Sequence, residues 1–478
     1  MNHLPAAGIR RRDFLKTAAL GAAATIIGPM VSADLAEAQT GPATGPFRAR
    51  NTDLEEMTIG QLQASMTTGR FTAASLARKY LEQIHRLDQS GPALKAVIEL
   101  NPDALALAQA LDQERKISGP RGPLHGIPVL IKDNIGTRDR MSTTAGSLAL
   151  VGAVCPRDAF LVQRLRAAGA VLLGKTNLSE WANFRSTRST SGWSGRGGQT
   201  RNPYVLDRNP SGSSSGSAVA VSANLCAVAV GTETDGSILS PSSYNGIVGI
   251  KPTLGLISRS GIIPIAHSQD TAGPMARTVT DAAILLGVLA GLDPQDQAGV
   301  LPGRKACADY TIFLDRNGLR GARLGVARKF FGSHPEADRL IELAIAEMKQ
   351  RGAVIIDPAD LPTHGKFDDS EQEVLLYEFK SDLNSYLAAL GPTTPSRTLH
   401  DLIAYNEANR EREMPFFGQE LFLQAEAKGP LTESAYRSAL EKNHRLARTE
   451  GIDALLQQHQ LDAIIAPTSG PAHVTDWV

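Results

Sequence analysis

Three residues of this sequence have the type and setting that nucleophilic chemistry needs. Lys132 directly follows a run of five apolar residues. Ser213 lies in a stretch of Ser and Gly residues, and Ser237 ends a polar turn that follows another apolar run. A serine hydroxyl becomes a nucleophile when an adjacent base takes its proton, and lysine is such a base only if burial lowers its pKa toward the working pH. These three residues are therefore the first candidates for a site.

Lys132 is the candidate base. It closes the run Ile127–Ile131, which is typical of a buried strand. Burial at the end of such a strand disfavours the ammonium form and can leave a neutral amine that accepts a proton. The alternative is a lysine that simply emerges into solvent, and this segment alone does not decide between the two.

The two serines lie in segments rich in small or polar residues. The residues of Ser211–Ala218 let the backbone turn sharply and open directly into an apolar run, although a flexible linker is the alternative. In the turn Gly231–Ser237 several backbone N–H groups have no obvious partner and could hold a developing oxyanion. An ordinary polar turn is the alternative there.

Taken together and in this order, the three segments resemble the amidase signature family. The resemblance covers about residues 54–281 and includes the segments Gly246–Thr253 and Asp270–Arg277. The interval of 24 residues between Ser213 and Ser237 also matches the spacing of this family. Several separate motifs in the same order rarely occur together by chance.

The resemblance implies a role for each candidate residue. Ser237 would attack an amide carbonyl, Ser213 would pass on its proton, and neutral Lys132 would accept it. In this family the relay serine follows a cis peptide bond. The resemblance implies neither a cofactor nor a metal ion. The oxyanion hole would be formed by backbone N–H groups of Thr234, Asp235 and Gly236.

One departure from the common pattern points to a subfamily. Many members carry Gly-Gly-Ser-x-Arg at the nucleophile, whereas this chain has Asp235-Gly236-Ser237-Ile238-Leu239. This variant resembles the bacterial peptide amidases, which release ammonia from C-terminally amidated peptides. The alternatives are a general aryl, aliphatic or amino-acid amidase and an amidotransferase A-type subunit. Either way, the partner is a small-molecule or peptide amide.

Asp235 presents an electrostatic problem, because a carboxylate beside an oxyanion hole opposes the charge that develops there. Its side chain must therefore point away from the hole, be paired or be protonated. Our hypothesis is that Asp235 repels free C-terminal carboxylates and so favours the amide over the acid product. A purely structural role in the turn is the alternative.

Other hydrolase classes fit less well. Residues 212–216 fit G-x-S-x-G, but the Ser-His-Asp hydrolases need a strand directly before it, and residues 201–210 contain two prolines and several charges. No lysine has a serine three positions earlier, which excludes the S-x-x-K enzymes, and zinc-binding patterns are absent. We expect His125 and His267 to be hydrogen-bonded structural residues. A non-catalytic binding protein is unfavoured while all three reactive residues are present.

The candidate residues must be positioned by an alternation of strands and helices. Apolar periodicity predicts helices at 58–66, 72–87, 102–117 and 158–168, and strands at 96–100, 127–131, 170–173, 225–230 and 461–465. This order indicates an α/β fold: a single large domain whose central mixed, twisted sheet is covered by helices on both faces. Residues 185–217, taken alone, have the composition of a linker. Residues 291–430 form a more helical segment that we expect to cover the sheet.

Composition and charge exclude several kinds of partner. Lys plus Arg and Asp plus Glu number 49 each, so no overall charge favours nucleic acid or an anionic membrane. The 3 cysteines are too few and too scattered for a disulfide scaffold. The oligomeric state does not follow from the sequence.

The first residues resemble an export signal. Residues 1–38 contain Arg11-Arg12-Asp13-Phe14-Leu15-Lys16, a weakly apolar stretch and the cleavage pattern Ala36-Glu37-Ala38, as twin-arginine signals do. The apolar stretch is shorter than the ~20 residues that a membrane span needs. We therefore expect export of the folded enzyme to the periplasm or medium, with no stable membrane association after cleavage.

We further expect a flexible lead at 39–52 and one domain over 53–478. Members of the family usually continue beyond the segment that matches Ala466-Pro467-Thr468, whereas this sequence ends at Val478. The domain is therefore expected to be shortened at its C-terminus, and unpaired edge strands near residues 461–478 would support this expectation.

Overall fold

The computed structural model describes residues 53–300, 306–391, 394 and 396–475, all of which belong to one compact unit. The predicted export signal at 1–38 and the lead at 39–52 lie outside the described residues. Within the described part, no helix has both the length and the apolar character needed to cross a membrane.

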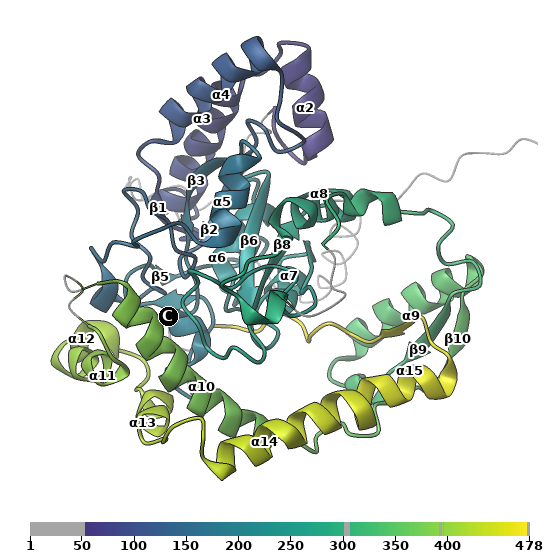
Figure 1. Cartoon of the computed structure of the whole chain (residues 1–478). Coiled ribbons are helices and arrows are strands. Elements are labelled where there is room, and N and C mark those ends of the chain that lie inside the picture. The colour runs from purple at the N-terminus through teal and green to yellow at the C-terminus, as the bar shows by residue number, and fades with distance from the viewer. Residues whose placement is uncertain (1–52, 301–305, 392–393, 395, 476–478) are drawn as a thin grey trace, which may run out of the picture. The chain divides into compact units, whose positions relative to one another are not determined.

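A six-stranded mixed sheet lies at the centre of the fold (Figure 1). Its order is β1-β3-β2-β6-β8-β7. Strands β2, β3 and β6 are parallel to one another, whereas β1, β8 and β7 join by antiparallel pairing. The strands are β1 Val97–Leu100, β2 Pro128–Lys132, β3 Val171–Thr176, β6 Val228–Glu233, β7 Val248–Gly249 and β8 Thr271–Ala276.

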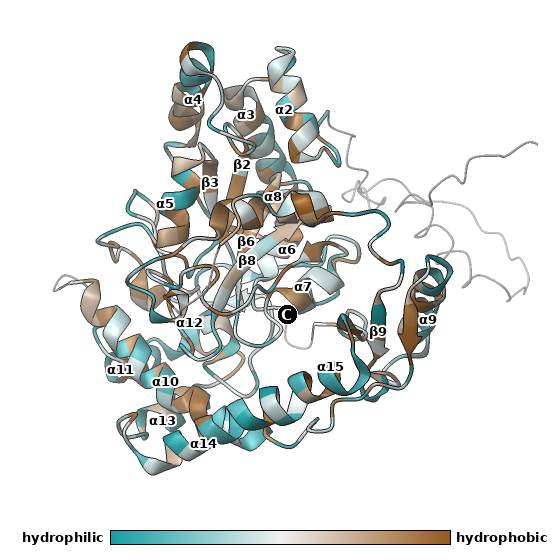
Figure 2. Cartoon of the chain, turned by 45° about the vertical axis from the view of Figure 1, so that its right-hand side comes forward, coloured by the Kyte–Doolittle hydropathy of each residue, from teal (hydrophilic) through white to brown (hydrophobic). Residues whose placement is uncertain are grey.

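Both faces of this sheet are covered. Every residue of β2, β3, β6 and β8 is buried. Because successive side chains of a strand point to opposite faces, this pattern requires helices on both sides. Figure 2 shows β2 in the brown of hydrophobic residues, whereas α14 in the outer part is mostly teal. The helices of this region are α2 Ile59–Thr67, α3 Ala73–Gln83, α4 Ala104–Ser118, α5 Phe160–Ala167, α6 Ser215–Ser222, α7 Leu239–Tyr244 and α8 Val279–Leu289.

The local signals of the sequence explain where these elements begin. Thr58 and Thr72 both form capping boxes, so that α2 and α3 start where apolar periodicity predicted helices. The predicted helix at 72–87 is continued by a π-helical turn, Ile84–Gln89. The predicted helices and the four predicted strands before residue 231 are all confirmed, with boundaries shifted by a few residues.

A second sheet of three strands is separate from the central one. Its strand order is β10-β9-β11. The strand predicted at 461–465 is confirmed as β11 Ala463–Ile465, which pairs in parallel with β9 and is an edge strand of this sheet. The remaining elements here are β9 Arg323–Val326, α9 Pro335–Gln350, β10 Val354–Ile356, α14 Ser434–His444, the π-helical segment Arg445–Ile452 and α15 Asp453–His459.

A group of four helices covers loops rather than strands. Its apolar side chains share a core with the loops that follow β2 and β3 and with the loop before β8. The helical segment expected between 291 and 430 therefore covers the end of the sheet where these loops meet. These helices are α10 Asp368–Ala389, α11 Leu399–Ala408, α12 Arg410–Glu413 and α13 Glu420–Glu426.

The stretch 185–217 is packed structure and not a linker. It contains the short hairpin of β4 Trp193–Ser194 and β5 Gly198–Gln199. Trp193 is 5% exposed and lies edge-on to Phe416 and Phe417. Polar side chains and backbone groups here bond to one another and to neighbouring loops, which is why the composition alone resembled a linker.

Candidate active site

Lys132, at the end of β2, is wholly buried. Its Nζ lies 2.8 Å from Ser213 Oγ, 2.9 Å from Thr232 Oγ1 and 3.2 Å from Thr232 O. Burial lowers the pKa of Lys132 to about 7, although the charges of Glu233 and Asp270 oppose this shift. A substantial fraction of this amine is therefore neutral near pH 7.

The partners of Lys132 also fix the direction of its lone pair. A neutral amine has two hydrogens to donate, and the carbonyl and hydroxyl oxygens of Thr232 can accept both. The lone pair then faces the hydroxyl of Ser213. Asn134 Nδ2 donates to Thr232 Oγ1 over 2.9 Å and so helps to hold this hydroxyl as an acceptor. No role was assigned from the sequence to Thr232, which lies in the turn segment Gly231–Ser237, or to Asn134, two residues after Lys132.

Ser213 is fully buried in the turn before α6. The peptide bond Gly212–Ser213 is cis, as the family resemblance implied. The carbonyl of Ser213 accepts the N–H of Ser179 over 3.1 Å. The next residue, Ser214, joins the two serine turns, because its N–H donates to Ser237 O over 3.0 Å.

The turn that carries Ser237 is closed by Glu233. The carboxylate of Glu233 accepts the N–H groups of Ile238 and Leu239 over 2.7 and 2.9 Å. Gly236 has a φ of +69°, a left-handed conformation that glycine adopts without steric penalty. Ser237 is 7% exposed, and among the described residues no hydrogen bond joins its hydroxyl to that of Ser213. The structure thus forms the bond between base and relay but not the one between relay and nucleophile.

The predicted oxyanion hole has free donors. In the described part of the chain, the N–H groups of Thr234, Asp235 and Gly236 donate to no other protein atom. Thr234 is held from both sides, because its hydroxyl donates to Asp270 Oδ1 over 2.6 Å and its carbonyl accepts from Lys251 Nζ over 2.5 Å. Burial raises the pKa of Asp270 to about 6.

Asp235 is exposed, and its carboxylate is paired. Gln269 Nε2 donates to Asp235 Oδ1 over 3.1 Å and to Glu371 Oε1, on α10, over 2.8 Å. Desolvation by the surrounding protein raises the pKa of Asp235 and of Glu371, and the charge of Asp235 raises the pKa of Glu371 further. Gln269 thus links the carboxylate of Asp235 to that of Glu371.

A cavity of ≈ 220 Å³ lies beside Thr232 and Thr234. Its wall combines an apolar run, Ile262–Ile265, with charged side chains that are already paired, such as Arg259 with Asp296. Its other lining residues include Asn134, Ala182, His267, Asp270 and Asp382. This space borders the turn that leads to Ser237 and has room for part of a substrate.

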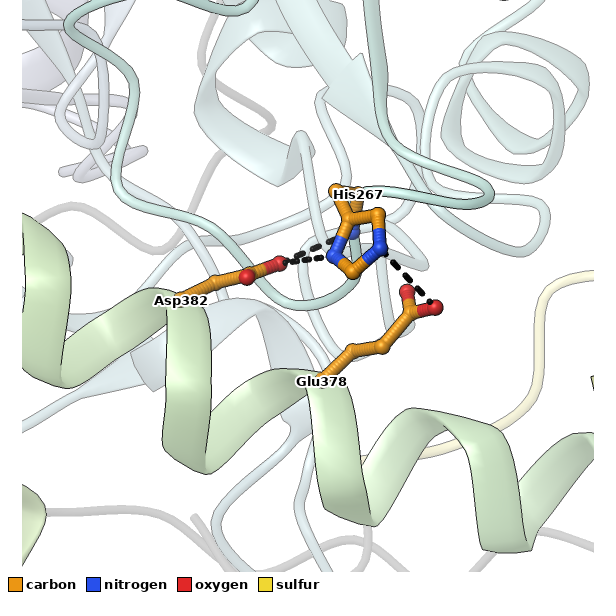
Figure 3. A group of neighbouring side chains, drawn as sticks. All are labelled: His267, Glu378 and Asp382. Carbon is orange, nitrogen blue, oxygen red and sulfur yellow. Dashed lines mark hydrogen bonds and ion pairs between the residues drawn. The ribbon is translucent and has the colours of Figure 1, made fainter. Parts of the chain in front are cut away.

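His267 lies between Asp382 and Glu378 of α10 (Figure 3). Its Nδ1 is 2.8 Å from Asp382 Oδ2 and its Nε2 is 3.3 Å from Glu378 Oε1. Such a trio can bind metal ions. These carboxylates, however, also accept hydrogen bonds from the hydroxyl of Tyr436 and from the N–H groups of His267 and Ser268. The bond to Asp382 raises the pKa of His267. The three side chains thus bond to one another and to neighbouring protein groups.

The histidines otherwise fit the structural role that the sequence predicted. His125 Nε2 lies 2.9 Å from Leu111 O, and its Nδ1 accepts the N–H of Arg121. No histidine of the described residues is hydrogen-bonded to Ser213 or Ser237. The arrangement around the serines therefore contains a lysine in the position where a Ser-His-Asp enzyme has histidine.

Both the sequence and the structure match known proteins over most of the chain. The family model described as amidase matches residues 76–476. A probable amidase of Arabidopsis thaliana is 47% identical over 425 residues, which cover 86% of this chain and 80% of that protein. The A-type subunit of the glutamyl-tRNA(Gln) amidotransferase of Chloroflexus aurantiacus is 41% identical over 312 residues, which cover 64% of this chain and 61% of that protein.

Two solved structures of peptide amidase are similar throughout. The native peptide amidase of Stenotrophomonas maltophilia is 54% identical with a TM-score of 0.84, covering 88% of this chain and 86% of that one. Peptide amidase PAM in complex with the competitive inhibitor chymostatin is 53% identical with a TM-score of 0.86, covering 89% of this chain and 86% of that one.

Proposed function

We propose, on the premise that this chain belongs to the amidase family and is an amidase that hydrolyses amide C–N bonds, that it removes ammonia from C-terminally amidated peptides. In this proposal Ser237, Ser213 and Lys132 carry out the hydrolysis. The similarity to two peptide amidase structures supports the substrate class, as does the Asp-Gly-Ser variant at the nucleophile.

The observation that carries the catalytic proposal is the 2.8 Å contact between Lys132 Nζ and Ser213 Oγ in full burial. An amine with a pKa of about 7 can take a proton near neutral pH, and its hydrogens are directed at Thr232. Ser213 is then left to donate its proton to the lone pair. This is the arrangement that a relay needs before it can deprotonate a nucleophile.

The proposed reaction proceeds in two halves. Ser237 Oγ attacks the amide carbonyl while its proton passes to Ser213 and the proton of Ser213 passes to Lys132. The N–H groups of residues 234–236 stabilise the oxyanion. The relay returns a proton to the leaving nitrogen, the C–N bond breaks and ammonia departs. Water then attacks the acyl-enzyme by the same route and releases the acid.

We also propose that the pair Asp235 and Glu371 disfavours the acid product. A free C-terminal carboxylate close to this pair meets negative charge, whereas the neutral amide does not. Asp235→Asn should therefore strengthen product inhibition by several-fold. Unchanged inhibition by the acid would contradict this role and leave Asp235 as a structural residue of the turn.

We also propose that the enzyme works in the periplasm or medium and binds no nucleic acid. The twin-arginine pattern supports export to the periplasm or medium, and the equal numbers of acidic and basic residues support the absence of a nucleic-acid partner. After cleavage of the signal, the enzyme has no stable membrane association in this proposal.

The test is ammonia release from a panel of amides. The panel contains amidated peptides, amino-acid amides, aryl and aliphatic amides and free glutamine, with Ser237→Ala as the inactive control. We expect amidated peptides to give the highest kcat/KM by at least about tenfold, because binding contacts along the peptide can be used in the transition state. Higher kcat/KM for simple amides would identify a general amidase, and preference for glutamine would favour the amidotransferase alternative.

A further inference from the structure

A fully buried arginine lies between two buried glutamates behind the serine turns. Arg185, Glu180 and Glu413 are each at most 1% exposed. Arg185 Nη1 donates to Glu180 Oε1 over 2.6 Å and to the carbonyl of Glu413, and it lies 3.9 Å from Glu413 Oε2. Two residues of this trio come from the loop after β3, whereas Glu413 ends α12.

The cluster is bonded to neighbouring backbone groups, although Arg185 Nε and Nη2 and Glu413 Oε2 have no hydrogen-bond partner among the described residues. Glu180 Oε2 accepts the N–H of Gly195 over 2.6 Å, and Glu413 Oε1 accepts the N–H of Leu148 over 2.7 Å. The guanidinium of Arg185 lies over the ring of Phe417 at 4.4 Å. A buried ion cluster of this kind contributes little net stability compared with apolar residues, so its role must be sought in what it positions.

The cluster closes a strained turn. Trp181, Ala182 and Asn183 have φ values of 50°, 54° and 71°, so three successive non-glycine residues are left-handed. Side chains with a Cβ rarely adopt this conformation, and such strain persists only where the surroundings enforce it. Glu180 and Arg185 flank the three residues and are bonded to each other. Their ion pair therefore holds the two ends of the turn together.

The residue before this turn region also contacts Ser213, the proposed relay. Ser179, which precedes Glu180, donates its N–H to Ser213 O over 3.1 Å. The fit is tight, because a Cβ on Gly212 would come within 2.2 Å of Ser179 Oγ. On the other side, Ala182 lines the cavity beside Thr232. A shift of this turn would therefore move the backbone of Ser213.

We propose that Glu180, Arg185 and Glu413 form a positioning unit, which enforces the left-handed turn at residues 181–183 and thereby holds Ser213 in its relay position. The inference rests on the relay role proposed for Ser213. It also gives the helices around α12 a function, since Glu413 anchors them to this turn. None of the three residues contacts the substrate in this proposal.

The test uses the different demands of amide and ester substrates. The amide nitrogen must gain a proton before it can leave as ammonia, whereas an alcohol leaves with much less assistance, so a displaced relay harms amide hydrolysis more than ester hydrolysis. The ratio of ester to amide kcat is also independent of the fraction of folded enzyme. A merely structural role would lower both rates equally.

Glu180→Gln is the main variant. One end of an amide is an NH2 donor, so the new side chain can no longer accept hydrogen bonds from both Arg185 and Gly195. We expect amide kcat to fall about 30-fold and ester kcat about threefold, with KM nearly unchanged, since small misplacements of catalytic groups cost up to about 10²-fold. Gly195→Ala is the milder second variant, since its Cβ would come within 2.7 Å of Glu413 Oε2 and 3.0 Å of Glu180 Oε2. We expect it to raise the ratio about threefold, within the same limit.

Arg166→Met is the matched control. Arg166 also pairs with two carboxylates, those of Asp139 and Asp158, but it has no bond to the turn at 179–185. We expect this variant to lower stability without changing the ester-to-amide ratio. An unchanged ratio in both test variants, or an equal rise in Arg166→Met, would overturn the positioning proposal. Full amide activity in Ser213→Ala would instead overturn the relay role itself, which separates the two failures.

Discussion

Two lysines on neighbouring strands of the central sheet are both buried yet have different partners. Lys132 ends β2, and Lys175 lies in β3 one position before Thr176, which pairs with Lys132. Both are 0% exposed, and burial lowers the pKa of each. Since neighbouring residues of a strand alternate between faces, the two side chains point to opposite sides of the sheet.

The partners of the two amines decide what each can do. Lys175 Nζ donates to the carbonyl of Ile135 and to Thr143 Oγ1, and the charge of Asp133 opposes the lowering of its pKa. Lys132 instead contacts a serine hydroxyl whose turn is joined to Ser237. Burial alone therefore does not make a base. A proton acceptor also needs its lone pair directed at a hydroxyl, and the partner of Lys132 that fits this need is Ser213.

Removing each amine in turn is the most direct test of the difference between Lys132 and Lys175. Lys132→Met should lower kcat by at least about 10³-fold, because general-base catalysis and activation of the nucleophile are lost together. Lys175→Met should retain kcat within a few-fold per folded molecule. Active-site titration combined with ammonia release measures both. Near-normal turnover in folded Lys132→Met would refute the role of this lysine.

The same two variants should change stability in opposite directions. The pKa of Lys132 falls from 10.5 to about 7 on folding. Below pH 7 the amine is therefore charged in the folded state, and the full cost of burying that charge lowers the free energy of unfolding. Between pH 7 and 10.5 the unfolded chain binds the extra proton, and wild-type stability rises with pH. Lys132→Met should therefore raise the free energy of unfolding by about 2 kcal/mol at pH 7, and less at pH 10.

Lys175→Met should instead lower the free energy of unfolding by about 3 kcal/mol, because it leaves the buried Asp133 with fewer balancing charges. Urea unfolding at pH 7 and at pH 10 measures both changes. Destabilisation by Lys132→Met that does not vary with pH would contradict the lowered pKa of this group.

The hydroxyl that accepts from each lysine provides a finer comparison. Thr232→Val removes an acceptor for Lys132 and leaves the direction of its lone pair less fixed, so kcat should fall about 30-fold. Thr143→Val removes the matching acceptor of Lys175 and should cost about 1 kcal/mol of stability without affecting kcat. Thr232→Ser, which keeps the hydroxyl, should restore most of the activity. Equal kinetic effects of the two valine variants would remove the distinction.

The smallest expected difference between wild type and Lys175→Met is in the pH profile. Because Lys132 must be unprotonated, kcat/KM should rise with pH through a midpoint near 7, falling about tenfold per unit well below it. Lys175→Met should leave this midpoint in place, since the two amines act on opposite faces of the sheet. Steady-state kinetics between pH 5 and 9 test this, and a flat profile would contradict the assignment.

Residues in continuous motifs could be found from the sequence, and residues joined across the fold could not. Lys132 and the two serines stood out because each lies within a short segment whose apolar run predicts a strand or helix. Thr232 and Asn134 lie in or beside the same segments, but their contacts depend on how β2 and β6 pair. The partnership of Arg185 with Glu413 spans 228 residues and left no local signal.

By itself the sequence determined the α/β alternation and the family and marked Lys132, Ser213 and Ser237 as candidates, because periodicity, caps and motif spacing are local properties of the chain. Only the tertiary structure decided that Lys132 is buried against Ser213 and Thr232 while Lys175 is buried against Ile135 and Thr143, and that residues 185–217 are packed and not a linker. Burial and charge pairing depend on which distant segments meet. The pKa of a lysine, and with it the chemistry available to that residue, is therefore set by the fold.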